Sequence, residues 1–351
     1  MSIENYIRAM PKAELNVHLE GAVRNETWMM IAEQNEIPAE SKEYNSWVQL
    51  LDNPDYAQLE ELIQTMTGWL RYPEDLTRLV YDLGVSLSKQ NVKYAEVSVN
   101  LALLMPAGLT FDEFLNALND GRDRAERGWG IRISWILTVP RNQPRRADEI
   151  LRWATSVTGK RGGVVAFGLI GHEDVQPVGQ FERAFNAAQK KDIPRVVQAG
   201  DVRGADGVLE ALQQLNASRI VDGWGVADAP DALKLFDERD IPLVVSMGKA
   251  LCHDLVKEYS AYPIQRLYDE NVKLVISADL PNLYKTELSD EYLAAVEHCN
   301  LSLEELEELA LNALQFSYLP DEDKATMIAE FEATYTRLRA EHISAEEDVA
   351  D

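Results

Sequence analysis

Pro242-Leu-Val-Val-Ser246 and Val272-Lys-Leu-Val-Ile-Ser277 are short apolar runs in which hydrophobic and polar residues do not strictly alternate. Such runs are typical of strands buried on both faces, as in a parallel sheet. Eight runs along the chain are interpreted as strands. They cover residues 13–20, 92–100, 131–139, 164–171, 194–201, 218–225, 242–249 and 272–280.

Amphipathic stretches with helical spacing, such as residues 181–191 and 207–215, separate these runs. Because strand and helix alternate from about residue 90 onward, the pattern predicts an α/β fold, a (β/α)₈ TIM barrel. The first connection, residues 22–90, is much longer than the others and is interpreted as a helical cap insertion after the first strand. With no Gly/Ser linker, we expect a single domain over residues 1–343, followed by an acidic tail at 344–351.

Charge and composition narrow the class of partner. The chain has 34 Lys and Arg against 59 Asp and Glu, a formal charge of −25, which repels nucleic-acid phosphates and anionic membranes. No stretch reaches the ~18 apolar residues of a membrane span, and the N-terminus lacks the pattern of a signal peptide. Cys252 and Cys299 lie far apart, against a disulfide framework. We therefore expect a soluble cytoplasmic protein that binds neither nucleic acid nor membranes.

Polar residues gather at the predicted C-terminal strand ends, where TIM barrels place their reactive groups. Asn16 and His18 are two residues apart on the first strand and point to the same side. Further polar or aromatic residues at strand ends are Gln198, Asp201, Asp222, Trp224, Ser246, Lys249, Ser277 and Asp279. Because an unpaired buried charge is costly, the group indicates a ligand or reaction site rather than a structural polar plug.

Five short motifs carry a resemblance to a known family. They are Pro11-Lys-Ala-Glu-Leu-Asn-Val-His-Leu-Glu-Gly21, Leu169-Ile-Gly-His-Glu173, Gln198-Ala-Gly-Asp201, Arg219-Ile-Val-Asp-Gly223 and Ser277-Ala-Asp-Leu-Pro281. In this order the chain resembles the adenosine deaminase family of metal-dependent hydrolases, from residue 8 to about residue 338. In the first motif, the family has His-x-His where this chain has Asn16-Val-His18.

The resemblance implies a zinc ion, held by three histidines and an aspartate, that activates water to replace the amino group of a purine with loss of ammonia. Only His18 and Asp279 keep familial ligand types, so a metal site there is vestigial at most. Asn16 and Gln198 are neutral amides that bind zinc poorly. We therefore expect no cofactor and in particular no zinc. A harder divalent ion such as Mg²⁺ or Mn²⁺, which takes oxygen ligands, stays an alternative.

The proton-transfer positions differ from the family pattern as well. Asp201 stands where the family has a glutamate, Asp222 where it has a histidine and Leu280 where it has an aspartate. The pocket motif keeps Gly171, although His172 replaces an acidic neighbour. The candidate catalytic residues are Asp201, Asp222 and Asp279. The candidate substrate-binding residues are Gly171, His18, Asn16, Gln198, Trp224 and Lys249.

Several functions remain open at this point. The first is a barrel that holds a small purine- or nucleoside-like ligand without ordinary zinc-dependent deamination. The second is a divergent hydrolase of a nucleoside-like substrate, either metal-free through Asp201, Asp222 and Asp279 or with a non-zinc ion. In that setting an inward Lys249 would replace the missing cation. Two further alternatives are a weak adenosine or aminopurine deaminase and a structural protein in which side chains fill the opening of the barrel. The sequence does not fix the oligomeric state.

Overall fold

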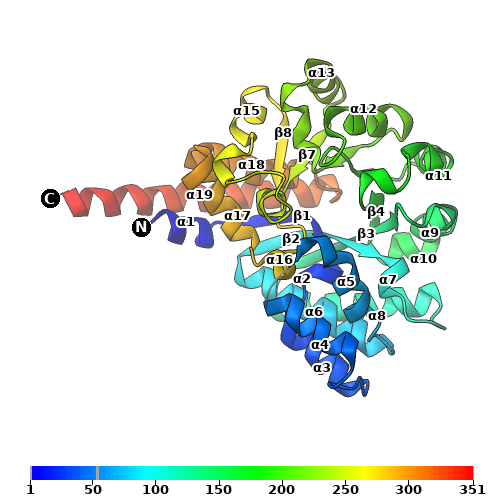
Figure 1. The fold of residues 1–351 in the computed structure, drawn as a ribbon. Coiled ribbons are helices and arrows are strands. Elements are labelled where there is room, and N and C mark those ends of the chain that lie inside the picture. Colours follow the sequence, from blue (N-terminus) through cyan, green and yellow to red (C-terminus); the bar gives the residue numbers. More distant parts are fainter. Residues whose placement is uncertain (1, 53–54, 351) are drawn as a thin grey trace.

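The computed structural model describes residues 2–52 and 55–350, without the side chains of residues 52 and 342–350. Eight parallel strands in the order β1 to β8 form a nearly closed barrel, with helices around it (Figure 1). The expected TIM barrel is therefore confirmed. The strands are β1 (Lys12–His18), β2 (Val92–Asn100), β3 (Arg132–Pro140), β4 (Val164–Ile170), β5 (Arg195–Gln198), β6 (Arg219–Val221), β7 (Pro242–Val245) and β8 (Lys273–Ile276).

The first and last strands approach each other next to the predicted site. The backbone N–H of His18, at the end of β1, donates to the carbonyl of Asp279, just after β8, at 2.9 Å. The carboxylate of Glu14 on β1 accepts from the backbone N–H of Ala278 at 3.0 Å. These two bonds hold together the strand ends that carry His18 and Asp279.

Several strands are shorter than the sequence predicts, because the backbone turns out of the extended conformation at or near the predicted catalytic residues. Asp222 has φ 65° and Asp279 has φ 57°, a left-handed conformation that ends an extended strand. Gly200, between Gln198 and Asp201, has φ +104°. The predicted strands 194–201, 218–225 and 272–280 therefore end early, and Asp201, Asp222 and Asp279 lie in the loops that follow them.

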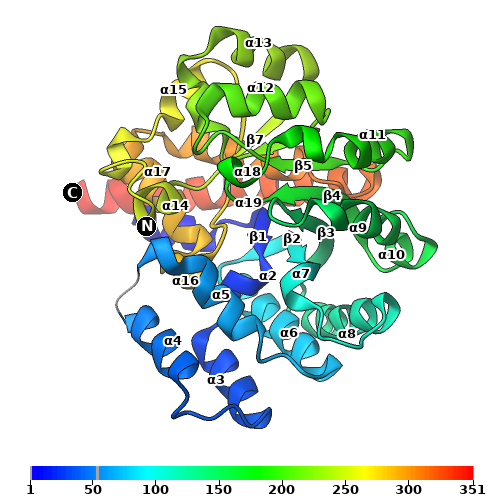
Figure 2. The ribbon, with the colours of Figure 1, turned by 45° about the vertical axis from the view of Figure 1, so that its right-hand side comes forward.

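Helices fill the connections and pack on the barrel. Those before β2 are α1 (Ile3–Ala9), α2 (Leu19–Ala22), α3 (Asn25–Gln34), α4 (Lys42–Asp52), the 3₁₀ helix η1 (Tyr56–Gln58), α5 (Leu59–Thr67) and α6 (Pro73–Lys89). In Figure 2, α3 and α4 lie at the lower edge of the molecule, with α5 between them and the barrel. The segment 22–90 is thus helical, while its role as a cap stays a prediction.

The later connections follow the expected strand–helix alternation. Their helices are α7 (Leu101–Leu104), α8 (Phe111–Trp129), η2 (Pro144–Arg146), α9 (Ala147–Ala154), α10 (Val157–Arg161), η3 (Glu173–Val175), η4 (Val178–Gln180), α11 (Glu182–Lys190), α12 (Gly204–Gln214), η5 (Gly223–Asp228), α13 (Pro230–Arg239), α14 (Met247–Cys252), η6 (Tyr259–Ala261) and α15 (Ile264–Asp269). After β8 come α16 (Pro281–Tyr284), α17 (Leu288–Cys299), α18 (Leu303–Gln315) and α19 (Asp321–Ala350).

The C-terminal end of α19 projects away from the barrel (Figure 1). Its backbone is helical through residues 344–350, the stretch that the sequence assigns to an acidic tail, and Asp351 lies outside the described residues. The division into a domain and a tail stays a prediction. Along the described chain, no helix combines the length and the apolar character needed to cross a membrane.

Candidate functional site

Lys249 lies at the centre of the predicted site, on the short helix α14 that follows β7. Its Nζ is 3.3 Å from Asp279 Oδ2 and 3.8 Å from Asp201 Oδ2, and it forms a closer ion pair with Asp222 Oδ2. The lysine is 8% exposed, and Asp222 and Asp279 are 2% and 3% exposed. The three aspartates predicted as catalytic therefore meet around one buried ammonium group.

The charge states follow from this geometry. Burial alone would lower the pKa of Lys249, but the carboxylates of Asp222, Asp279 and Asp201 outweigh burial and raise that pKa well above its usual value. Burial raises the pKa of Asp222, while the Lys249 ammonium opposes that rise. Because the pair is in direct contact, we assign a protonated lysine and an ionised Asp222. A protonated amine is not a nucleophile, so Lys249 acts as a fixed positive charge.

His18 faces the same cluster from β1. Its Nε2 lies 3.3 Å from Asp279 Oδ1 and its Nδ1 lies 3.5 Å from Glu20 Oε1. Burial would lower the pKa of His18, but Asp279 and Glu20 outweigh it and raise the pKa. The imidazole thus bridges two carboxylates, one on each side of the ring.

Gln198, at the end of β5, uses both ends of its amide. Its Oε1 accepts from the backbone N–H of Gly171 at 2.9 Å, and its Nε2 donates to Asp222 Oδ2 at 3.2 Å. Gly171 has φ +102°, which favours glycine in the loop after β4. Gln198 therefore joins the predicted pocket loop to the charged cluster.

Asn16 and Asp201 each have a polar atom without a hydrogen-bond partner among the described residues. Asn16 Nδ2 is buried, in a residue that is 2% exposed, and Asp201 Oδ1 is buried as well. A buried donor or acceptor without a partner costs about 1–3 kcal/mol, so such atoms are candidates for ligand contacts. Here a donor and an acceptor are both available at the strand ends.

Trp224 is a predicted site residue whose described contacts lie outside the charged cluster. It lies in η5 after β6, and its ring packs on that of Tyr262 with centroids 5.5 Å apart. It is partly buried against the hydrophobic core. A stacking role for Trp224 stays a prediction, because the contact that the structure gives its ring is with another aromatic side chain.

Sequence reasoning missed two acidic side chains that support the site. Glu14, on β1, accepts from the backbone N–H groups of Asn16 and Ala278, each at 3.0 Å. Glu291, on α17, accepts from the backbone of Met247 at 2.9 Å and of Gly248 at 2.8 Å, which fixes the start of α14. An acidic residue inside a buried strand is a signal for Glu14. Glu291 sits in an ordinary amphipathic helix, and nothing in its sequence context distinguishes it.

An aromatic cluster near the site was missed as well. The ring of Tyr56, from η1, has its centroid 5.8 Å from those of His253 and Tyr284. His253 Nε2 lies 3.1 Å from the Tyr284 hydroxyl. Burial and the positive charge of Lys249 lower the pKa of His253. These contacts attach the connection between β1 and β2 to the loops after β7 and β8.

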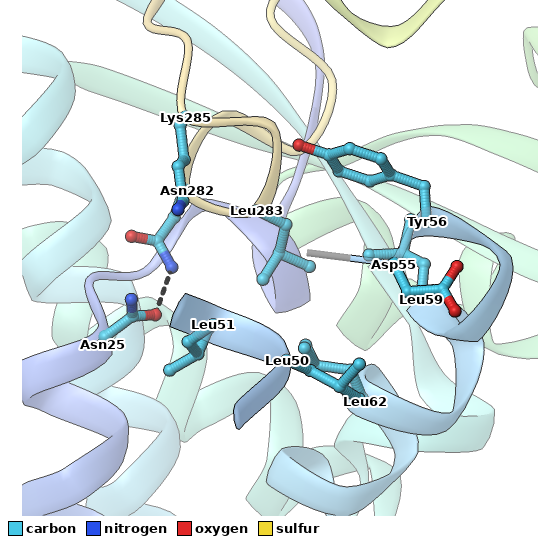
Figure 3. A pocket seen from close by; sticks show the side chains of 10 residues that line it. All are labelled: Asn25, Leu50, Leu51, Asp55, Tyr56, Leu59, Leu62, Asn282, Leu283 and Lys285. Atoms are coloured by element: carbon cyan, nitrogen blue, oxygen red, sulfur yellow. Dashed lines mark hydrogen bonds between the residues drawn. The ribbon is translucent and has the colours of Figure 1, made fainter. Parts of the chain in front are cut away.

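A separate cavity lies beside this cluster, between α4, α5 and α16 (Figure 3). Its lining residues are Asn25, Leu50, Leu51, Asp55, Tyr56, Leu59, Leu62, Asn282, Leu283 and Lys285. No predicted site residue is among them. The charged cluster at the strand ends and this hollow are therefore distinct features.

A family model described as adenosine deaminase matches residues 11–334, most of the chain. The chain belongs to the adenosine deaminase family. Among curated relatives, aminodeoxyfutalosine deaminase of Streptomyces avermitilis is 29% identical over 95% of this chain and 93% of its own length. Adenosine deaminase of Clostridium botulinum is 29% identical over 91% of this chain and 96% of its own length. The resemblance read from the motifs is thereby confirmed.

Solved structures show the same fold. Adenine deaminase from Arthrobacter aurescens superposes with a TM-score of 0.84 at 21% identity, over 93% of this chain and 99% of that chain. An amidohydrolase from Burkholderia ambifaria, solved with bound Zn, superposes with a TM-score of 0.88 at 23% identity, over 98% and 96%. At these identities the likeness concerns the fold alone.

These findings correct the expectation of no cofactor. The chain belongs to the adenosine deaminase family, and a structure with the same fold has bound Zn, so family membership points to a metal ion rather than to none. The expectation was wrong because it rested on two ligand positions alone. Nothing in the comparisons shows that a metal site has been lost.

The side chains of this chain nevertheless do not reproduce the zinc ligand set that the family resemblance implies. Within residues 2–52 and 55–350, no group of three or more His, Cys, Asp and Glu side chains is arranged to hold a metal ion. The Gln198 amide oxygen is bonded to Gly171, and the Lys249 ammonium lies among the carboxylates. Family membership therefore points to a metal ion, while the described side chains at the C-terminal strand ends are not arranged to hold one.

Proposed function

We propose that this adenosine deaminase family member binds a small purine- or nucleoside-like molecule at the C-terminal ends of its strands, and that ordinary zinc-dependent deamination is slow or absent. One observation carries the binding part. Asn16 Nδ2 is a buried donor without a partner among the described residues, and Asp201 Oδ1, after a different strand of the same barrel, is a buried acceptor in the same state. Purines offer both ring-nitrogen acceptors and amino-group donors, which suit this pair.

Relatives support the ligand class. The curated relatives are named for deamination of adenosine and of aminodeoxyfutalosine. Arabidopsis ADAL structures with TM-scores of 0.83 were solved with GMP and IMP. In this proposal Gly171, Asn16, Gln198 and Asp201 contact the ligand, while His18 and Asp279 are what remains of the familial metal ligands.

The chemistry of the cluster supports the catalytic part. Family deamination, as the resemblance describes it, needs an activated water and groups that move protons to the purine. In this chain a glutamine and an asparagine replace two imidazoles, Asp222 replaces a third and is paired with Lys249, and Leu280 replaces an aspartate. Asp222 is buried and its carboxylate is already engaged by the Lys249 ammonium, so it cannot take the place of the familial histidine without breaking that ion pair.

A second candidate is favoured by the burial and pairing of the charged cluster. His18, Asp222, Lys249 and Asp279 are each at most 8% exposed, and three ion pairs converge on one Nζ. This is the arrangement expected of a structural polar plug, in a protein whose partner lies elsewhere on the barrel. The two candidates differ in whether a purine stabilises the protein.

A panel assay separates these functions. Purified protein is mixed with adenosine, adenine, AMP and aminodeoxyfutalosine, each with and without added Zn²⁺, Mn²⁺ or Mg²⁺. Thermal shift reports binding, an ammonia assay reports deamination and chromatography reports release of a free base. We expect at least one purine to raise Tm by several degrees in wild type and less in Asn16→Leu, with little ammonia released.

Three outcomes would contradict the proposal or change it. Absence of any thermal shift with all four compounds favours the structural plug. Ammonia release with kcat/KM above about 10⁴ M⁻¹s⁻¹, the ordinary range for an enzyme on its own substrate, overturns the catalytic part. Release of a free purine base instead of ammonia supports hydrolysis through Asp201, Asp222 and Asp279.

A further inference from the structure

The Lys249 ammonium is surrounded by carboxylates that come from three different loops. Asp201 follows β5, Asp222 follows β6 and Asp279 follows β8, and each places one Oδ2 within 4.0 Å of the same Nζ. No other basic side chain forms an ion pair with any of these three aspartates among the residues that the structure describes, apart from His18 with Asp279. One lysine thus pairs with three acids.

The lysine is held rigidly in this place. It sits on α14, whose first turn is fixed because Glu291 accepts from the backbone N–H groups of Met247 and Gly248. The His253 backbone N–H donates to the Lys249 carbonyl at 3.0 Å, at the end of the same helix. A buried lysine on an anchored helix has little freedom to swing its charge away from the aspartates.

We propose that the Lys249 ammonium and a divalent cation compete for the carboxylates of Asp222 and Asp279, so that Lys249 lowers the affinity of this barrel for metal ions. Both cations need the same carboxylate oxygens. A divalent ion bound to these oxygens would also lie within a few ångströms of the ammonium, where repulsion between like charges is strong in a buried site. This competition accounts for the disagreement between the family and the local side chains, and it does not depend on which small molecule the barrel binds.

Metal titration of chelator-dialysed protein tests the competition directly. Zn²⁺ and Mn²⁺ are titrated separately into wild type and Lys249→Met by calorimetry, with competition against a chelator where binding is tight. Methionine is close to lysine in length and carries no charge. We expect Lys249→Met to bind one equivalent of at least one of the two ions about 10²-fold more tightly than wild type, because the repulsion is gone.

Two matched variants show whether the gain belongs to this site. Lys234→Met removes an exposed lysine that is paired with Glu238 at 3.4 Å, and its metal affinity should equal that of wild type. Adding Asp222→Asn to Lys249→Met removes one of the two carboxylates for which lysine and metal compete. This double variant should lose most of the gain in metal affinity. A gain that persists in this double variant would place the metal elsewhere and overturn the proposal.

The metal affinity of wild type can also contradict the proposal. If wild type binds both ions as tightly as Lys249→Met, the lysine and the metal do not compete. If Lys249→Met does not fold in metal-free buffer, it is refolded with Zn²⁺ or Mn²⁺ present, since an ion that binds only the folded state stabilises it. Recovery of cooperative thermal unfolding with metal supports the proposal, and failure to recover with either ion overturns it.

Discussion

Gln198 Oε1 accepts a hydrogen bond from the backbone N–H of Gly171 at 2.9 Å, so an amide at a familial ligand position fastens the loop after β4. The same amide donates to Asp222. Gln198→Leu keeps a similar volume but leaves the Gly171 N–H without its partner. We expect the free energy of unfolding to fall by about 1–3 kcal/mol, measured by urea denaturation.

The control for this substitution is Gln189→Leu, since Gln189 is exposed on α11. A surface change of this kind is expected to stay within about 0.5 kcal/mol. If the two variants unfold at the same urea concentration, the bond between Gln198 and Gly171 contributes nothing to stability.

Leu280 leaves no room for a side chain at position 21. A Cβ added to Gly21 would lie 2.1 Å from Leu280 Cδ2 and 2.8 Å from Leu280 Cβ. Gly21→Ala should therefore destabilise the protein by about 1–3 kcal/mol, the usual cost of overpacking. Leu280→Ala in the same chain removes the nearer atom and should recover part of that loss in thermal unfolding.

Gly128 provides the matched control, because nothing lies within 4 Å of a Cβ built there. It lies inside the helix α8, where alanine is preferred to glycine, so Gly128→Ala should raise Tm slightly. Equal effects of Gly21→Ala and Gly128→Ala would contradict the steric argument.

Glu291 gives the stability of the protein a specific pH dependence. Burial raises the pKa of its carboxyl from 4.5 to about 8 in the folded protein, although two backbone N–H groups oppose the shift. The folded protein thus keeps this proton to a higher pH than the unfolded chain does. Between these two values unfolding releases the proton, so stability falls as the pH rises.

Glu291→Gln removes this titration and keeps one oxygen acceptor for the backbone of α14. We expect wild type to lose stability relative to this variant as the pH rises from about 5 to about 8, measured by denaturant unfolding at fixed ionic strength. Wild-type and variant curves that stay parallel across this range would show that the carboxyl does not titrate there.

The fold follows from local features of the sequence, and the site follows only partly. Val- and Ile-rich runs separated by amphipathic stretches are enough to predict eight strands. That Asn16 and His18 share one side of β1 stays a prediction, since the register of β1 against β2 is irregular between Glu14 and Val17. The early ends of β5 and β6 depend on positive φ values at Gly200 and Asp222, which residue type alone does not fix.

Contacts between residues distant in sequence account for what could not be predicted. That Gln198 bonds Gly171 depends on the register of β4 against β5, and that Glu291 supports α14 depends on how α17 packs. The meeting of Lys249 with three aspartates was foreseen only as one alternative, since the direction of a lysine side chain depends on the backbone that carries it.

Arg219 and Glu96 form an ion pair at 2.6 Å with both side chains fully buried, between β6 and β2. Removing one member leaves the other charge buried without its partner, so Arg219→Met should lower the free energy of unfolding by about 3–5 kcal/mol. Adding Glu96→Gln should recover part of this loss, since no unpaired charge remains. The control is Arg132→Met, which breaks a partly exposed pair with Asp323 and should change stability by less than about 1 kcal/mol. Urea unfolding of these variants measures the difference, and a double variant no more stable than Arg219→Met would show that the cost does not come from the stranded carboxylate.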